Sequence, residues 1–203
     1  MSGKREQIKK GMSTKTFDEV YLGSSKINST LTFKANKSIF EVEKKILLKD
    51  KDIRTRFLTS WSGGEKIYYS NSRERKSKVK NCKTLGECFI INSDYRDWIL
   101  LHETKKIENY LCYKAIKSTR KKNVYIVAWY APEIPVNFGP KGYDGLPGLV
   151  LELQEPTIIF KAKKIILNPK QKITIDKPIK GIIITEKEFK EKVSNLANNI
   201  FKN

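Results

Sequence analysis

The sequence predicts a mainly β (α+β) fold: a strongly curved antiparallel sheet or partial barrel, with one amphipathic helix packed on it near the C-terminus. Three observations support this prediction. Short β-prone runs follow one another along most of the chain, no helical periodicity lies between them, and the apolar residues change to a helical period after residue 184. The 203 residues suffice for one large domain with a substantial core.

The first half of the chain contains the first expected strands. Residues 30–35 alternate between polar and apolar types, which is typical of a half-buried strand. Residues 56–61 and 66–69 flank a Gly-Gly pair, and this pattern predicts a hairpin with a glycine turn. Residues 73–80 are so highly charged that we expect an exposed loop there, with the densest positive charge of the protein.

The second half continues the series of strands. Residues 98–101 and 110–116 flank a polar turn and predict a second hairpin, and residues 123–130 are strongly β-prone. A loop rich in proline and glycine follows at residues 131–148. Further strands are expected at 149–153, 157–167 and 172–175. Runs of strands without intervening helices favour an antiparallel sheet or barrel.

A helix is predicted at the end of the chain. Thr185 and Glu188 have the spacing of a capping box, in which each side chain bonds the other's backbone N–H. One face of the helix collects the apolar residues Phe189, Val193, Leu196, Ala197, Ile200 and Phe201. We favour a helix that covers one face or mouth of the sheet; the alternative is a helix that binds a membrane or a partner.

The chain is strongly basic, with a formal net charge of +19 from 41 basic and 22 acidic residues. Such an excess attracts nucleic acid, anionic lipid or acidic proteins. Only seven of the basic residues are arginine, whose planar fork reads bases, so sequence-specific nucleic-acid binding is not expected. A solvated lysine-rich surface is the favoured interpretation, and polyanion binding is the alternative. The candidate polyanion patch comprises Arg73, Arg75, Lys76, Lys78 and Lys80.

Three cysteines leave one unpaired under any pairing. Cys82 and Cys88 enclose a short stretch that fits a hairpin disulfide in an oxidising compartment, and Cys112 is then a small buried strand residue. The alternative is a metal site. Zinc needs four closely spaced ligands, however, and the single histidine is His102, so we expect no metal.

The residues offer no enzyme active site. His102 has no partner that would complete a nucleophile arrangement. Residues 139–142 contain glycine and lysine but lack the spacing of a phosphate-binding loop and the helix that follows it, and Pro140 removes a backbone donor. We therefore expect a non-catalytic protein with no cofactors.

Residues 128–152 form the most specific stretch, with a Trp-Tyr strand end, a proline-rich loop, a Gly-Pro turn, the motif GLPGL and an apolar strand. This stretch resembles the GLPGLI family of Gram-negative, Bacteroidota-type bacteria, with Val150 in place of the last Ile. Residues 97–115 and 178–189 also resemble the family. The resemblance implies a single β-rich domain over residues 29–203, preceded by a poorly matched, loose segment at 1–28.

The resemblance also implies a location and a partner. Proteins of this family are exported, have no established activity and are often encoded beside TonB-dependent outer-membrane transporters. The expected function is thus a non-catalytic binding or accessory protein of the periplasm or outer membrane, which partners such a transporter or holds an apolar ligand. The charged first residues lack an apolar leader, which fits either the cytoplasm or a removed leader. No apolar run approaches the roughly 20 residues of a membrane-spanning helix.

The proline- and glycine-rich loop has two interpretations. Pro147 and Gly148 suit the second and third positions of a tight turn, which indicates a rigid structural corner. A rigid loop that displays aromatic residues would instead be a preformed docking site, because its ordering on binding costs little entropy. The candidate docking residues are Tyr130, Pro132, Pro135, Phe138, Tyr143, Gly145, Leu146, Pro147 and Gly148.

Overall fold

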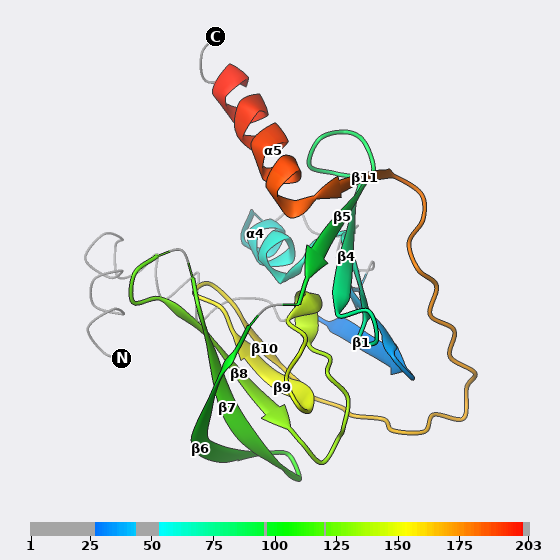
Figure 1. Cartoon of the computed structure of the whole chain (residues 1–203), viewed down its shortest axis with the longest axis vertical. Helices are drawn as coiled ribbons and strands as arrows, with labels where there is room; N and C mark the ends of the chain where they lie inside the picture. The colour runs from blue at the N-terminus through cyan, green and yellow to red at the C-terminus, as the bar shows by residue number, and fades with distance from the viewer. Residues whose placement is uncertain (1–26, 44–52, 96, 120, 201–203) are drawn as a thin grey trace.

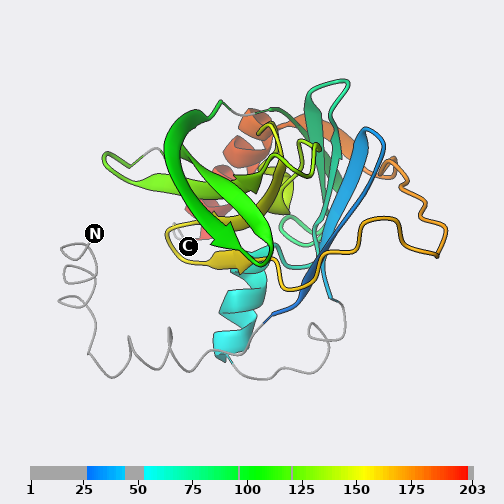
Figure 2. The same ribbon diagram turned by 90° about the horizontal axis from the view of Figure 1, so that it is seen from below.

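The computed structural model describes residues 27–43, 53–95, 97–119 and 121–200, and over these ranges the protein is mainly β (Figure 1). The described strands form two sheets, one of six strands and one of five. The sheets curve around a shared interior without closing into one barrel, as the view from below shows (Figure 2). The predicted mainly β fold is therefore confirmed, with two sheets where the sequence suggested one.

The six-stranded sheet has the order β1-β2-β3-β4-β5-β11. Its first five strands are antiparallel neighbours: β1 (Ser29–Lys34), β2 (Lys37–Val42), β3 (Ile67–Asn71), β4 (Lys76–Asn81) and β5 (Phe89–Asp94). The last strand, β11 (Ile182–Thr185), pairs with β5 in parallel. A parallel neighbour requires a long crossover, and the chain reaches β11 through residues 162–181.

This crossover, residues 162–181, passes around the outside of the six-stranded sheet (Figure 1). It contains no strand, so the predicted strand at 172–175 is wrong. The Lys34 ammonium donates to the Ile173 carbonyl at 3.0 Å and fixes the crossover to β1. At its start the crossover is also tied to the five-stranded sheet, because the Ala162 N–H donates to the Leu151 carbonyl at 2.8 Å.

The five-stranded sheet is antiparallel throughout, in the order β10-β9-β8-β7-β6. Its members are β6 (Ile99–Ile107), β7 (Tyr110–Ser118), β8 (Tyr125–Ala131), β9 (Leu149–Gln154) and β10 (Ile159–Lys161). They correspond to the second predicted hairpin and to the strands predicted at 123–130, 149–153 and 157–167, the last of which is much shorter than predicted. The register shifts between Trp129 and Tyr130 where β8 meets β9. This irregularity precedes the proline- and glycine-rich loop.

A buried apolar cluster joins the two sheets. Phe40 of β2 meets Tyr68 of β3 at 5.9 Å and Phe160 of β10 at 5.8 Å between ring centroids, both edge to face. Ala128 and Leu153, from the centre of the five-stranded sheet, are fully buried in the same cluster. Burying one such large side chain contributes roughly 1.5–3 kcal/mol, so this cluster is a main source of stability.

Helix α4 (Ile53–Ser62) replaces the first strand of the hairpin that the sequence suggested. Phe57 and Trp61 stand one turn apart, with ring centroids at 5.8 Å, and stabilise the helix as a neighbouring pair. Gly63 and Gly64 donate to carbonyls three and five residues earlier, at 3.3 and 2.7 Å. These two bonds form a Schellman cap, so the Gly-Gly pair ends a helix and does not turn a hairpin.

Residues 76–80, expected to belong to an exposed loop, lie in β4 at the interior of the six-stranded sheet. Lys76, Lys78 and Lys80 alternate with Ser77 and Val79, which is the period-two pattern of a strand. Ser77 is buried, whereas the three lysines lie at alternate positions on the other face. The expectation of a loop is therefore wrong for this part of the run.

Helix α5 (Glu186–Ile200) confirms the predicted C-terminal helix. Glu188 N–H donates to Thr185 Oγ1 at 3.2 Å and Thr185 N–H donates to Glu188 Oε2 at 2.8 Å, which is the predicted capping box. The Phe189 ring packs against Phe89 of β5 at 5.5 Å, so the first turns of α5 lie on the six-stranded sheet. The rest of the helix points away from both sheets (Figure 1). No helix in the described ranges has the length and apolar character needed to cross a membrane.

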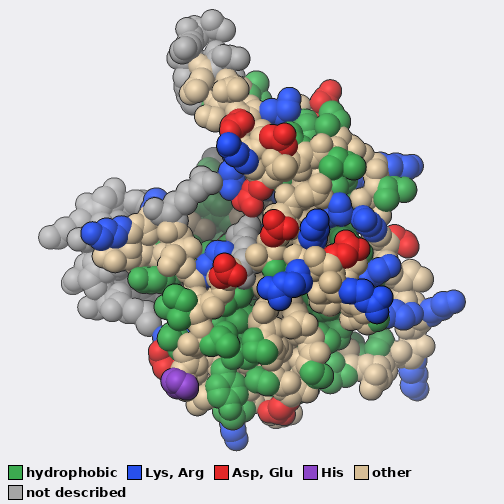
Figure 3. All heavy atoms as spheres, in the orientation of Figure 1, with side chains coloured by type: hydrophobic (Ala, Val, Ile, Leu, Met, Phe, Trp, Pro, Cys, Tyr) green, Lys and Arg blue, Asp and Glu red, His purple; other side chains and the backbone are tan. Residues whose placement is uncertain are grey.

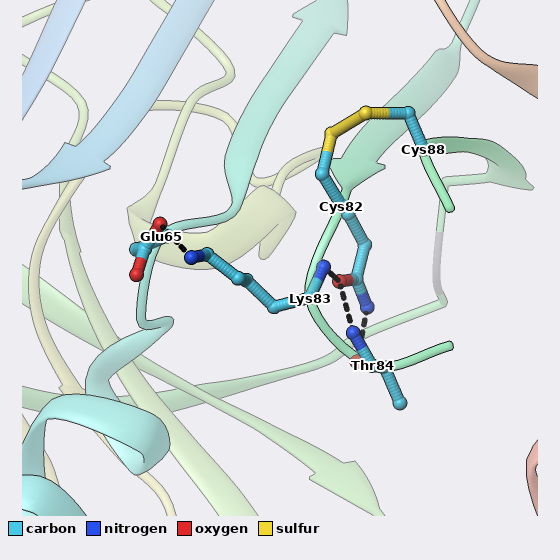
Figure 4. The surroundings of a disulfide bond; sticks show 6 residues. Glu65, Cys82, Lys83, Thr84 and Cys88 are labelled. Atoms are coloured by element: carbon cyan, nitrogen blue, oxygen red, sulfur yellow. Dashed lines mark hydrogen bonds and ion pairs between the residues drawn. A yellow bond between two sulfur atoms is a disulfide. The ribbon is translucent and has the colours of Figure 1, made fainter. Parts of the chain in front are cut away.

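The cysteines pair as predicted: a disulfide joins Cys82 and Cys88, with their Cα atoms 3.9 Å apart (Figure 4). It closes the loop of residues 82–88, named here the disulfide loop, between β4 and β5. Cys112 is a free thiol and is fully buried on β7. Both placements agree with the sequence analysis.

We predict that protein taken from an oxidising compartment and denatured without reductant contains one reactive thiol. In the native state Cys112 should react far more slowly with iodoacetamide, because burial excludes the reagent and raises the pKa of the thiol to about 11. Thiol titration with and without denaturant measures both effects. Three reactive thiols in the denatured protein would contradict the disulfide.

Candidate functional site

The loop between β8 and β9, residues 132–148, is named here the signature loop. It folds back on the start of β9: Leu149 N–H donates to the Ile134 carbonyl and Val150 N–H to the Phe138 carbonyl, both at 3.0 Å. A short 3₁₀ turn at Pro140–Gly142 lies within it. The loop is therefore fixed by regular backbone hydrogen bonds although it contains no strand.

Most large side chains of the signature loop point into the protein. Phe138 is 1% exposed and Leu146 is fully buried, while Tyr143 and, at the end of β8, Tyr130 are also buried. Phe138 packs 6.3 Å from Phe33 of β1, and Tyr143 packs 6.2 Å from Trp98. The expectation that the loop displays Phe138, Tyr143 and Leu146 in a docking surface is wrong, because these side chains complete the core between the sheets.

A buried carboxylate organises the loop. Asp144, 2% exposed, accepts the Gly139 N–H on Oδ1 at 2.9 Å and the Ser70 hydroxyl on Oδ2. The Asp144 backbone carbonyl accepts the indole N–H of Trp98 at 3.0 Å. An ionised group in the interior is tolerated only where such donors replace water. Asp144 thus connects β3, the entrance to β6 and the loop itself.

Two glycines of the loop are required by close packing. A Cβ on Gly148 would lie less than 3.0 Å from the backbone of Ala131 and Pro132, and a Cβ on Gly139 would meet the Tyr143 carbonyl equally closely. Gly145 has a φ of +97°, a conformation that side-chain-bearing residues rarely adopt. These contacts make the GLPGL motif a structural corner.

The outer side of the corner borders a recess of about 380 Å³, named here the tyrosine recess. Its lining comes from β7, the end of β8 and the signature loop, and consists of Leu111, Tyr113, Tyr130, Pro132, Glu133 and Pro147. Three predicted docking residues, Tyr130, Pro132 and Pro147, therefore do lie together at an accessible depression. Pro135 is exposed on the loop and does not line it.

The tyrosine recess is mainly apolar. The rings of Tyr113 and Tyr130 stand 6.2 Å apart and tilted, and burial, with the neighbouring Tyr113, raises the pKa of Tyr130 above its ordinary value. The phenol therefore stays neutral at physiological pH. Glu133 Oε1 accepts the Leu111 N–H at 3.3 Å, which ties the rim to β7. The site offers aromatic and proline surface with little charge.

The predicted polyanion patch divides between a turn and a strand. Arg73 and Arg75 lie in the β3–β4 turn, and the Arg75 guanidinium lies 5.8 Å from the Tyr95 ring. Lys78 Nζ donates to Asn92 Oδ1 at 2.6 Å, and burial together with Lys177 lowers the pKa of Lys78. Lysines of β4 and of the crossover thus meet on the outer face, where basic side chains gather on the right of Figure 3.

The side chains that commonly bind metals are dispersed over the described ranges. No three His, Cys, Asp or Glu residues among them are placed to hold a metal ion. His102 is an exposed residue of β6.

Sequence reasoning missed half of the tyrosine recess. Leu111, Tyr113 and Glu133 were not candidate residues, although Tyr113 lies directly opposite Tyr130 in the register of β7 and β8. Strand register depends on long-range pairing, and a single sequence does not specify it. The alternation of apolar residues at 111, 113 and 115 was the available signal.

The fold and this corner define a two-sheet β protein built around a buried proline- and glycine-rich loop. Residues 117–152, from the end of β7 into β9, match a family model described as "Protein of unknown function (Porph_ging)". The match contains the complete signature loop, and it is compatible with the GLPGLI resemblance of the same residues. No curated protein is significantly similar in sequence to this chain.

Two crystal structures of PNGF-II, in space groups P21 and C2, are similar to this chain. The TM-scores are 0.51 and 0.50, and the sequence identities are 20% and 18%. The similar region covers 82% and 83% of this chain but 29% and 30% of the PNGF-II chains. This chain therefore spans under a third of the length of those proteins, and at such identities the likeness concerns the fold alone.

We predict that Gly148→Ala destabilises the protein by about 2–4 kcal/mol, because the added Cβ meets backbone atoms that cannot rotate away. Gly86→Ala is the matched control: Gly86 also has a positive φ, of +77°, but a Cβ added there would have no neighbour within 4 Å. It should lose only roughly 1–2 kcal/mol from backbone strain. Urea unfolding of both variants measures the difference, and equal losses would contradict a packing role for Gly148.

Proposed function

We propose that this chain is a non-catalytic binding protein of the cell envelope, which holds an extended apolar segment of a partner protein in the tyrosine recess. The observation that carries the proposal is the recess itself, a depression lined by two tyrosines, two prolines and a leucine beside the most specific motif of the sequence. Surfaces of this composition bind proline-rich or aliphatic peptide segments.

The rigidity of the recess supports binding. Pro132 and Pro147 belong to a loop whose backbone is fixed by hydrogen bonds to β9, and Tyr130 is packed in the core. A partner therefore meets a preformed surface, and little conformational entropy is lost on binding. Aromatic residues held in this way are the usual anchors of protein interfaces.

The size of the recess favours a peptide over a whole lipid. Its volume of about 380 Å³ lies near the lower end of ligand pockets, which span roughly 300–1,000 Å³. One or two apolar side chains of an extended segment suit this space. The envelope location and an outer-membrane transporter as the partner rest on the resemblance of residues 128–152 to exported proteins.

The proposal predicts a crosslink that depends on the recess. A photo-reactive amino acid at Glu133, on the rim, should capture a defined envelope protein in cells of the native host, and Leu111→Ser should abolish the adduct. Leu167→Ser is the matched control, because Leu111 and Leu167 are 39% and 41% exposed but only Leu111 lines the recess. The adduct is measured by immunoblot and identified by mass spectrometry.

Both leucine variants should unfold at nearly the temperature of the unmodified protein, since each removes a partly exposed side chain. An adduct that survives Leu111→Ser would contradict the proposal, and so would one that disappears equally in Leu167→Ser.

A second candidate function is polyanion binding, and the row of lysines on β4 is the observation that favours it. Lys76 and Lys80 flank Lys78 on the outer face of the sheet, and Lys177 of the crossover lies close enough to lower the pKa of Lys78. An anionic polymer or lipid surface would relieve this mutual repulsion.

Binding to this face should be weak, independent of sequence and strongly reduced by salt, because it releases counterions and reads no bases. We predict that Lys76→Glu with Lys80→Glu reduces the affinity for a labelled DNA duplex and for anionic vesicles, whereas Lys121→Glu with Lys122→Glu, in the β7–β8 turn, has a smaller effect. Fluorescence anisotropy and vesicle flotation across a salt series provide the measurement. Equal losses in the two double variants would indicate a general charge effect and remove the lysine row as a site.

A further inference from the structure

A second recess, of about 440 Å³, lies between the end of α4 and the disulfide loop and is named here the cationic recess. Three of its lining residues are cationic, Arg56, Lys66 and Lys83, and one is acidic, Glu65. The remaining lining is polar and includes the hydroxyl groups of Thr59, Ser60 and Thr84. Positive charge therefore exceeds negative charge in a concave site without aromatic walls.

Lys66 is the most constrained of the three cations. Its pKa is lowered by burial first and by the nearby Lys141 second. Lys141 is itself neutralised by an ion pair with Glu155 at 2.6 Å, whereas no carboxylate in the described ranges pairs with Lys66. A partly buried ammonium without a counterion is electrostatically unfavourable, and an anion from solution would stabilise it.

The acidic residue of the recess, Glu65, already forms a weak ion pair. Glu65 pairs with Lys83 at 3.3 Å, and both side chains are largely exposed (Figure 4). Exposed pairs of this kind contribute little, so Lys83 can exchange Glu65 for a ligand. Lys83 extends from the disulfide loop, whose backbone is fixed by the Cys82–Cys88 bond and by the Asn81 side chain, which accepts the Lys83 N–H at 3.1 Å.

The end of α4 does not oppose an anion here. The negative end of a helix dipole repels anions where the last carbonyls are unsatisfied. In α4, the Thr59 and Ser60 carbonyls accept the N–H groups of Gly64 and Gly63, and the Trp61 carbonyl accepts the Lys141 ammonium at 2.9 Å. These bonds occupy three of the last four carbonyls of α4, and Lys66 lines the recess beside them.

We propose that the cationic recess binds a small hydroxylated oxyanion, a sugar phosphate or a sugar acid, with Lys66 as its main ionic partner. Arg56 and Lys83 supply further donors for the oxyanion, and the hydroxyls of Thr59, Ser60 and Thr84 suit the hydroxyl groups of the sugar. The volume fits a ligand of this size. This site shares no lining residue with the tyrosine recess, so its test is independent of the test of the proposed function.

The test is an NMR titration of the isotopically labelled protein with glucose 6-phosphate, glucuronate, inorganic phosphate and neutral glucose. Glucose 6-phosphate or glucuronate should shift the amide signals of Lys66 and Thr84, and the arm that binds more tightly identifies phosphate or carboxylate as the preferred group. Lys66→Gln should weaken this binding at least about tenfold, because it removes a charged hydrogen-bond donor. Lys66→Arg should retain binding, and Lys122→Gln, an exposed lysine of the other sheet, should leave it unchanged.

Four results would overturn the proposal. The first is the absence of binding by both sugar anions, and the second is binding of neutral glucose as tight as that of the anions. The third is an effect of Lys66→Gln no larger than that of Lys122→Gln. Inorganic phosphate that binds as tightly as glucose 6-phosphate would also overturn it in the form stated, because the sugar would then contribute nothing.

Discussion

The buried carboxylate of Asp144 is the constraint on which the arrangement of the two sheets depends. Its bonds to Gly139 and Ser70, and the bond from Trp98 to its carbonyl, connect the signature loop to one strand of the six-stranded sheet and to the entrance of the five-stranded sheet. Because a buried charge must retain its donors, the loop cannot leave the interior without a large loss of stability. Burial raises the pKa of Tyr95, and the charge of Asp144 raises it further. The buried hydroxyl of Tyr95 has no hydrogen-bond partner in the described structure.

The corner and docking interpretations of the signature loop apply to opposite sides of the same segment. Its inner side supplies Phe138 and Leu146 to the core and needs glycine at 148 for backbone contact. Its outer side leaves the rings of Pro132 and Pro147 exposed beside Tyr113. A loop held by its core is rigid at its surface, so the structural role of the motif supports the binding role that we propose for its outer side.

Local patterns predicted the parts of the fold that local physics determines. The capping box at Thr185, the alternation in β1 and the short loop between Cys82 and Cys88 are all interactions between near neighbours, and each is present as expected. The predictions that were wrong or missing have two causes. In some places one local pattern fits two structures, and in others the structure depends on pairing between residues far apart in the sequence. Gly63 and Gly64 suit a helix cap as well as a hairpin, and neither the parallel pairing of β11 nor the facing of Tyr113 and Tyr130 has a local signal.

The crossover at residues 162–181 determines the order in which the protein can be completed during synthesis. The ribosome produces β5 well before β11, and every strand of the five-stranded sheet is made in between. Until β11 and α5 emerge, the pairing edge of β5 is open and Phe89 lacks the ring of Phe189. A nascent chain therefore exposes an unpaired strand edge, which is a site for chaperone binding or misassembly, until β11 pairs with it.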